Sequence, residues 1–182
     1  GENAAMTKLI LAHTGQLEPA VLTAAHQLLC QVFDGELTEH DWEHCLGGVH
    51  ALVWEGDELV GHAALIQRRL LHHGRALRTG YVEGVAVRAS ARRRGHGAAL
   101  MAALERVARN AYELAALGAT EEATAFYAGR GWRPWQGPTS ALTPAGIVRT
   151  EEEDGWIYVL PLSAELDLHG ELVCDWRDGD AW

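Results

Sequence analysis

Three consecutive arginines precede two glycines and a long segment with apolar residues at helical spacing. Arg92, Arg93 and Arg94 lead directly into Gly95-His96-Gly97. Glycine lets main-chain amides approach an anion closely, and a helix that starts here adds partial positive charge at its N-terminus. The pattern predicts an anion site, and a solvated basic loop is the alternative. The loop lacks the Gly-Lys-Ser/Thr of a Walker motif and the third glycine of a dinucleotide fingerprint.

A second candidate for chemistry is Glu83, which lies within the otherwise apolar stretch Tyr81–Val87. A charge inside a strand is costly unless it is paired or functional. The following Gly84 indicates a bulge, a device that re-aims a side chain near many active sites. Glu83 is therefore a candidate functional carboxylate.

Other carboxylates cluster late in the chain, in the run Glu151–Asp154 and then at Asp175, Asp178 and Asp180. The formal net charge is −10, from 25 Asp and Glu against 15 Lys and Arg. This balance argues against general binding of nucleic acid and leaves open a cationic ligand. Solvated surface is the other interpretation of such a run.

The segment from His40 to His44 matches His-x-x-Glu-His, an inverted zinc-protease signature. On a helix the two histidines would share one face, as zinc ligands do. No third ligand motif follows, and Thr38 with Asp41 resembles the cap of a short surface helix. A surface helix is the favoured interpretation, with no metal expected, and a zinc peptidase is the outside alternative.

Length and composition place the chain among single-domain proteins. With 182 residues, of which 48% are hydrophobic, we expect one domain over residues 7–182, with residues 1–6 a tail or an expression remnant. There is no run long enough to span a membrane and no signal-peptide pattern. Three scattered cysteines predict neither a disulfide framework nor a zinc site. We therefore expect a cytoplasmic protein that does not bind membranes.

Hydrophobic periodicity and turn residues predict the elements that must position these residues. Strands are expected at 8–12, 50–54, 59–67, 77–87, 115–119, 132–135, 157–160 and 171–175, and helices from 19, from 39, over 95–117 and over 121–129. Antiparallel strands followed by a βαβ-like unit give a mixed α/β (α+β) class.

The sequence "GYVEGVAV", an Arg-x-x-Gly-x-Gly loop and a long helix together resemble the GNAT superfamily of N-acetyltransferases. The stretches "GELTEHDWEHCLGGVHALVW", "HAALIQRRL", "FYAGRGWRPWQGPTSAL" and "LVCDWRDGDAW" resemble, more narrowly, the aminoglycoside 2′-N-acetyltransferases of actinobacteria. The resemblance extends from about Thr7 to Trp182 and also weakens the zinc interpretation, because the His40 segment belongs to the family's substrate side.

This resemblance implies a GNAT fold, a mixed and mostly antiparallel central sheet flanked by helices, with acetyl-CoA in the splay between central strands. It further implies a homodimer and the acetylation of aminoglycoside antibiotics at the 2′-amine, which confers resistance. The implied cofactor-binding residues are Val85, Ala86, Val87, Arg92, Arg93, Arg94, Gly95, His96 and Gly97. The implied substrate-binding residues are Glu36, Asp41, Glu83, Gly84, Gly118, Glu152, Glu153, Asp180 and Trp182.

For catalysis, the resemblance implies Glu83 as a general base acting through water and Tyr127 as the general acid for the leaving thiolate, in an ordered, direct transfer. Backbone donors near Val85 are expected to polarise the thioester oxygen. Trp182 is expected to contribute its α-carboxylate, so that its removal weakens aminoglycoside binding without loss of stability.

Three other functions remain open. Another polyamine or a cell-wall precursor could be the acceptor of the same enzyme, because an acidic site would bind either. A non-catalytic GNAT-like binding domain is opposed by the presence of both Glu83 and Tyr127.

Overall fold

Two long strands, β3 (Glu58–His72) and β4 (Arg75–Val87), each contribute residues to both of the compact units into which the chain divides. The computed structural model describes residues 6–182. The first unit holds the chain up to Ile66 together with Glu83–Val107, and the second holds Gln67–Val82 together with Ala108–Trp182. The single domain expected over residues 7–182 stays a prediction, and most of the expected tail, residues 1–5, lies outside the described residues.

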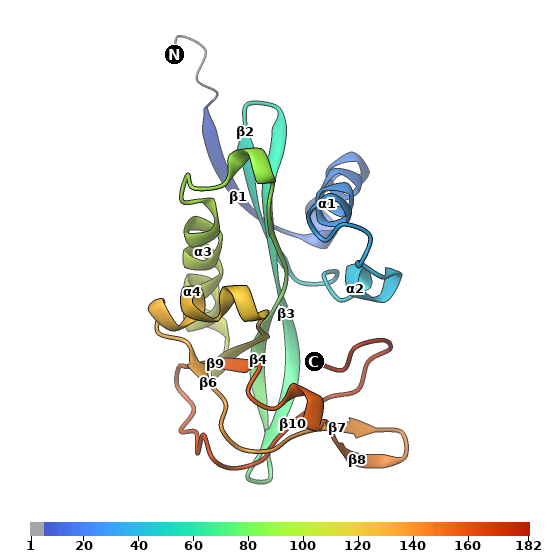
Figure 1. Ribbon diagram of the computed structural model, residues 1–182, viewed down its shortest axis with the longest axis vertical. Helices are drawn as coiled ribbons and strands as arrows, with labels where there is room; N and C mark the ends of the chain where they lie inside the picture. Colours follow the sequence, from blue (N-terminus) through green and yellow to red (C-terminus); the bar gives the residue numbers. More distant parts are fainter. Residues whose placement is uncertain (1–5) are drawn as a thin grey trace. The chain divides into compact units, whose positions relative to one another are not determined.

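The first unit is built on the antiparallel strands β1 (Thr7–His13), β2 (Val49–Glu55) and the first part of β3. Helix α1 (Pro19–Val32) begins with proline, whose fixed φ and missing N–H suit the first helical position. Its buried Ala25 and Leu28 pack against Leu52 and Leu59 of the strands. Helices α1 and α2 (Glu39–Glu43) lie on one face of these strands, and α3 (His96–Ala111) lies on the other (Figure 1).

The second unit contains a mixed sheet in the order β6-β9-β5-β4-β3-β10-β7-β8. Its further strands are β5 (Leu114–Gly118), β6 (Arg133–Pro134), β7 (Thr139–Thr143), β8 (Gly146–Arg149), β9 (Ile157–Pro161) and β10 (Leu172–Cys174). The pairs β4–β5 and β10–β7 are parallel, whereas β5–β9, β9–β6, β10–β3 and β7–β8 are antiparallel. Helix α4 (Thr124–Gly129) precedes β6. The mixed, mostly antiparallel sheet with helices confirms the predicted fold class.

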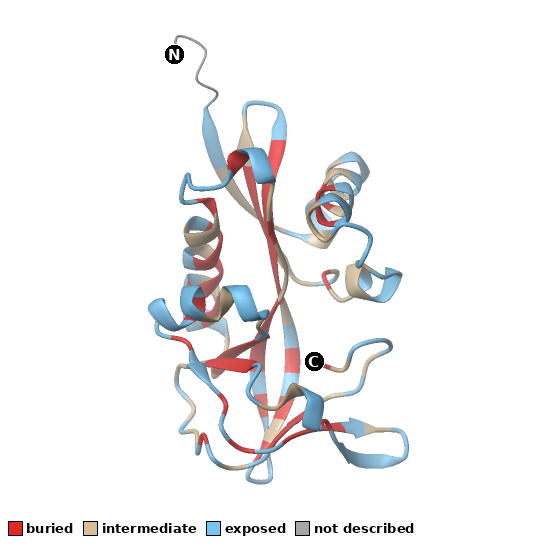
Figure 2. Ribbon diagram, viewed as in Figure 1, coloured by how far each residue is buried: buried red, intermediate tan, exposed pale blue. Residues whose placement is uncertain are grey.

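Burial follows the strands in each unit (Figure 2). Residues 51–53 of β2 and 59–65 of β3 are buried without interruption, because both of their faces are covered. In the second unit the buried cluster includes Tyr81, Trp135 and Trp182. Short 3-10 turns connect the elements at Thr14–Gln16, Ala89–Ala91, Glu121–Ala123 and Glu151–Glu153.

Two sequence predictions of secondary structure were wrong. Helix α3 ends at Ala111 and not at residue 117, because Leu114 begins strand β5 beside Thr79. The side chain and N–H of Glu113 both bond to the main chain of Arg78, which ties this segment to β4. The hairpin β7–β8 was missed, although Pro144 and Gly146 mark its turn.

Candidate active site

The predicted anion loop connects β4 to α3 in the first unit. Arg93 has φ +66° and Gly95 has φ +79°, whereas Arg92 has φ −68°. Turns with positive φ are a backbone conformation in which neighbouring main-chain N–H groups can face an anion together. The 16-residue helix α3 starts at the end of this loop and adds its dipole. The loop therefore fits a phosphate or diphosphate.

Two of the predicted cofactor side chains bond to the same carboxylate. The Arg94 guanidinium forms an ion pair with Glu55 at the end of β2, and His96 Nε2 lies 2.7 Å from the other oxygen of the same carboxylate. These hydrogen bonds, that from His96 first and that from Arg94 second, hold the pKa of Glu55 below its usual range. Arg94 and His96 thus anchor the loop to β2, while Arg92 and Arg93 are exposed to solvent.

The centre of β4 has the irregularity that the sequence predicts. Gly84 has φ +58° inside the strand, and a Cβ there would lie 2.6 Å from Cys45 Sγ. Only glycine meets both conditions. The flanking Glu83 and Val85 are half-buried, whereas Ala86 packs fully into a cluster that contains Leu29.

Two further predicted substrate residues, Glu36 and Asp41, lie near α2. Thr38 caps this helix in a capping box: Asp41 N–H donates to Thr38 Oγ1 at 3.1 Å, and Asp41 Oδ2 accepts from Thr38 N–H at 2.9 Å. These two bonds hold the Asp41 side chain in place. Asp41 is half-buried, whereas Glu36 is exposed. The capped surface helix predicted from Thr38 is confirmed. Among residues 6–182, no group of three or more His, Cys, Asp or Glu side chains could hold a metal ion.

Tyr127, the predicted general acid, lies on α4 in the second unit. Its side chain is 6% exposed and packs near Phe126 and Trp132. Burial raises the pKa of the Tyr127 phenol to about 12. The hydroxyl therefore keeps its proton at neutral pH, as an acid must.

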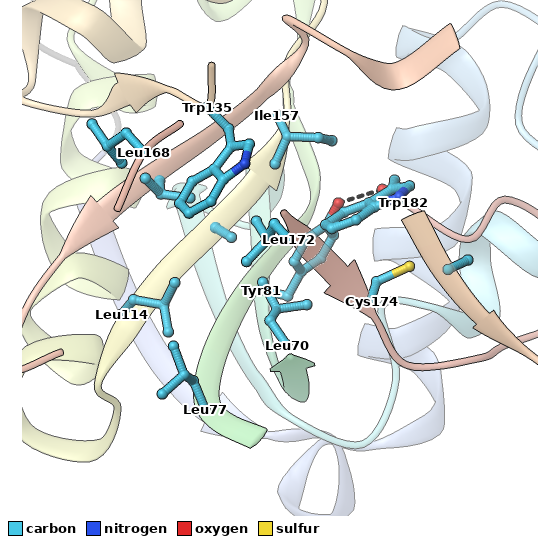
Figure 3. Packing of buried hydrophobic residues seen from close by; sticks show 13 residues of the cluster. Leu70, Leu77, Tyr81, Leu114, Trp135, Ile157, Leu168, Leu172, Cys174 and Trp182 are labelled. Carbon is cyan, nitrogen blue, oxygen red and sulfur yellow. Dashed lines mark hydrogen bonds between the residues drawn. The ribbon is translucent and has the colours of Figure 1, made fainter. Parts of the chain in front are cut away.

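Ala181 and Trp182 pack against the buried cluster of the second unit. Trp182 is 5% exposed within the buried cluster, and its indole N–H donates to Thr150 Oγ1 at 2.9 Å. Figure 3 shows the indole beside Tyr81, whose hydroxyl donates to the main-chain oxygen of Trp182. A Cβ on Gly118 would lie 3.4 Å from that same oxygen. The buried indole revises the expectation that Trp182 can be removed without loss of stability.

Arg68 holds this segment in place, and the sequence analysis did not identify it. Its Nε donates to Asp175 Oδ1, and its Nη2 donates to the main-chain oxygens of Asp175 and Ala181, each at 2.7 Å. The guanidinium also lies 4.7 Å from the centre of the Tyr81 ring. Burial lowers the pKa of Arg68, but Tyr81 and Asp175 outweigh it, so that the pKa is raised. The alternation of "HAALIQRRL" places Arg68 on the same face of β3 as Leu70, and this was the available signal.

The predicted carboxylates near the chain end gather beside Trp182. Asp180 Oδ1 accepts the Trp182 N–H at 3.0 Å. Burial, Asp180 and Glu152, in that order, raise the pKa of Glu153. Such mutual destabilisation of negative charge means that a cation binding here would be stabilised. The second unit thus brings together Gly118, Glu152, Glu153, Asp180 and Trp182, which come from three separate stretches of sequence.

Part of the chain matches the model of a known protein family. Residues 16–135 match the model of the acetyltransferase (GNAT) domain. This match covers β4, the anion loop, α3 and Tyr127. Residues 136–182, with the carboxylates around Trp182, lie beyond it.

A relative named aminoglycoside 2′-N-acetyltransferase, from Mycolicibacterium fortuitum, is 48% identical over an alignment of 176 residues that covers 94% of this chain and 90% of the relative. Among solved structures, Escherichia coli ElaA superposes with a TM-score of 0.61 at 24% identity, covering 86% of this chain and 99% of that one. An acyl-CoA N-acyltransferase from Pseudomonas aeruginosa superposes with a TM-score of 0.61 at 18% identity, covering 85% and 99%. These two structural matches support the fold alone.

Proposed function

Because this chain belongs to the GNAT family of acetyltransferases, in the group of the aminoglycoside 2′-N-acetyltransferases, we propose that it acetylates the 2′-amino group of aminoglycosides. The observation that carries this proposal is the 48% identity over 94% of the chain, a coverage that extends well beyond the GNAT domain match at residues 16–135. Acetylation removes a positive charge and a donor from the drug, and so would give resistance.

The acetyl donor is acetyl-CoA, which supplies an activated acetyl thioester when it is bound. The loop of alternating φ and the N-terminus of α3 would hold its diphosphate through main-chain N–H groups, helped by Arg92 and Arg93. Arg94 and His96 would keep the loop in shape through Glu55. Residues 85–87 of β4 would lie along the part of the cofactor that carries the acetyl group.

The chemistry requires an unprotonated amine, because only a free lone pair attacks the thioester carbon. Glu83 would take the proton of the amine through a water molecule, and Tyr127 would give its proton to the leaving thiolate. The raised pKa of Tyr127 keeps the phenol protonated at neutral pH, so that its proton is still present when the thiolate leaves. The N–H of Val85 would stabilise the charge that develops on the thioester oxygen.

The acceptor is a polycation, and the residues proposed to bind it carry negative or acceptor groups. In the first unit these residues are Glu36, Asp41, Glu83 and, through its main chain, Gly84. In the second unit they are Gly118, Glu152, Glu153, Asp180 and Trp182. Charge-assisted hydrogen bonds are about twice as strong as neutral ones, and long-range attraction speeds encounter. No helix among residues 6–182 is long and apolar enough to cross a membrane. A cytoplasmic location and a homodimer remain predictions from the sequence.

A thiol-release assay with acetyl-CoA and a panel of acceptors tests this function. Tobramycin and the gentamicin C components carry a 2′-amine and should be acetylated, whereas amikacin and kanamycin A carry a 2′-hydroxyl and should be poor N-acceptors. NMR of the tobramycin product should show acetate on the 2′-nitrogen. Acetate on the 6′- or 3-amine would refute the regiochemistry, and a preference for spermidine would favour the polyamine alternative.

A further inference from the structure

Three hydrogen bonds in series connect the half-buried Thr14 and two buried histidines of the first unit to the main chain of β4. Thr14 Oγ1 lies 2.6 Å from His50 Nε2, His50 Nδ1 lies 2.9 Å from His62 Nε2, and His62 Nδ1 lies 2.7 Å from the carbonyl oxygen of Gly84. Both imidazoles are fully buried. The proposed chemistry uses neither of them.

The direction of these bonds is fixed by their two ends. The Gly84 carbonyl can only accept, so His62 carries its proton on Nδ1 and presents a bare Nε2. His50 must then donate from Nδ1, which leaves its Nε2 to accept from the Thr14 hydroxyl. Thr14 Oγ1 itself accepts from Gly47 N–H at 2.9 Å, so its proton is available for His50. Burial is the main cause that lowers the pKa of each histidine to about 4, so both rings are neutral at pH 7.

This series of hydrogen bonds also orients the N–H of Val85. A trans peptide is planar, and its C=O and N–H point in opposite directions. When His62 fixes the carbonyl of Gly84, it also fixes the direction of the N–H of Val85 in the same peptide. Donation to the carbonyl polarises the peptide and strengthens that N–H as a donor, and bonds in series strengthen one another.

The surroundings leave this peptide little freedom. The space where a Cβ of Gly84 would stand is closed by Cys45 Sγ at 2.6 Å and by the His62 ring at 3.3 Å. The His62 ring is flanked by Trp42, with ring centres 6.4 Å apart, and Trp42 in turn stacks on His26 at 4.7 Å. The imidazole therefore cannot turn away from the carbonyl without disturbing several packed rings.

The geometry points to His62 and His50 as positioning residues for acetyl transfer, which act by aiming and strengthening the Val85 N–H toward the thioester oxygen. This inference rests on the proposed function only for the use of Val85 as the donor. It assigns a purpose to two buried polar side chains that the proposed chemistry does not otherwise use.

The first test uses the wild-type protein alone. Long-range ¹H–¹⁵N correlation spectra of the full chain labelled with ¹⁵N-histidine should show His50 and His62 neutral at pH 7, each with its proton on Nδ1. A proton on Nε2 of His62, with Nδ1 bare, would remove the donor to the Gly84 carbonyl and reverse the bond to His50, and would overturn the inference without any variant.

The second test measures the thioester directly, by isotope-edited infrared spectroscopy of acetyl-CoA carrying ¹³C at the acetyl carbonyl. Binding to the wild-type protein should lower the carbonyl stretching frequency. In His62→Leu the frequency should return toward the free value. In His62→Asn it should stay near the wild-type value, because the amide nitrogen of asparagine stands where Nδ1 was. We expect kcat to fall about tenfold in His62→Leu, less than the roughly 10²–10³-fold loss when an oxyanion donor is deleted, with KM for acetyl-CoA unchanged.

The matched control is His72→Leu. His72 is also buried and also donates from Nδ1 to a main-chain carbonyl, that of Glu171, at 2.9 Å, but it belongs to the second unit. It should lower stability and leave the carbonyl frequency alone. If His62→Leu fails to fold, Thr14→Val, at the outer end of the series, should give a smaller shift in the same direction.

A wild-type frequency retained in both His62→Leu and Thr14→Val would overturn the positioning role. No frequency change on binding to the wild-type protein would overturn it as well, by removing Val85 as a donor. Neither result bears on the acceptor, because the proposed 2′-regiochemistry is decided separately by the NMR of the acetylated product.

Discussion

Replacing Trp182 with alanine tests whether the carboxyl-terminal segment is part of the fold and of the acceptor site. The side chain is 5% exposed, lies in the buried cluster of the second unit, and donates its indole N–H to Thr150. Truncation of a buried tryptophan typically costs about 3–5 kcal/mol. The neighbouring residues 178–180 are exposed and can relax toward the space, so we expect the lower value, about 3 kcal/mol. For a chain of this length that loss corresponds to a fall in Tm of roughly 6–12 °C.

The chain offers a matched control in Trp176, six residues earlier and 49% exposed. Trp176→Ala removes the same side chain from the same segment and should change stability by no more than about 0.5 kcal/mol. Thermal unfolding followed by circular dichroism measures both variants under one set of conditions. Equal Tm values for the two would refute the anchoring role of Trp182.

The same variant should also affect the acceptor. Asp180 accepts the main-chain N–H of Trp182, so loss of the anchor frees this carboxylate beside Glu153. A charge-assisted hydrogen bond contributes about 1.5–3 kcal/mol, equivalent to roughly 10–100-fold in affinity. We therefore expect KM for tobramycin to rise by at least about tenfold at low salt, with KM for acetyl-CoA unchanged. A tobramycin KM equal to that of the wild type would separate the chain end from the acceptor site.

Three further predictions concern the cofactor loop, the acid and the buried histidines. Gly95→Asp should sharply weaken acetyl-CoA binding measured by calorimetry. The control Gly74→Asp, at a glycine of similar φ and open surroundings, should leave binding unchanged. Equal affinities of the two variants would show that the loop does not bind the cofactor. Tyr127→Phe should lower kcat about 10²-fold with acetyl-CoA affinity intact, and a rate within about twofold of wild type would exclude it as the acid. Because the pKa values of His50 and His62 are lowered from 6.5 to about 4, their contribution to stability is complete above pH 6.5 and is lost as the pH falls toward 4. Between pH 6.5 and 4, urea unfolding should show that the free energy of unfolding falls by roughly 3 kcal/mol or more. The fall should be smaller in His50→Asn. An equal fall in that variant would contradict the lowered pKa of His50.

Sequence patterns predicted the elements whose signals are local. Pro19 opens α1, Thr38 caps α2, and the turn at Gly56–Asp57 separates β2 from β3, each within a few residues of its predicted place. The irregularity at Gly84 was predicted because a glycine that follows a carboxylate inside an apolar strand is typical of a bulge, and its φ is indeed positive. These features depend on dihedral preferences and capping groups that the neighbouring residues carry.

The features that were missed depend on distant partners. Leu114 continues the helical spacing of α3, but its pairing beside Thr79 of β4 outweighs that local preference. Arg68 finds its partners more than 100 residues away, at Asp175 and Ala181. His50 and His62 stand 12 residues apart on paired strands, and only the register of those strands brings their rings together. No local pattern contains this information.

The acidic run near the chain end illustrates how the fold assigns different roles to identical groups. Asp154 accepts from Arg149 and Thr139, and the bond from Arg149 above all lowers the pKa of Asp154 to about 2. The pKa of its neighbour Glu153 is raised instead, by burial first and then by nearby carboxylates. A lowered pKa marks a carboxylate whose charge the protein already balances, whereas a raised pKa marks one whose charge a bound cation would stabilise. Asp175 already has a cationic partner within the protein, because Arg68 Nε lies 2.7 Å from its Oδ1. Of the carboxylates that look alike in the sequence, it is therefore Glu153, together with Asp180, that we expect to meet the ammonium groups of the acceptor.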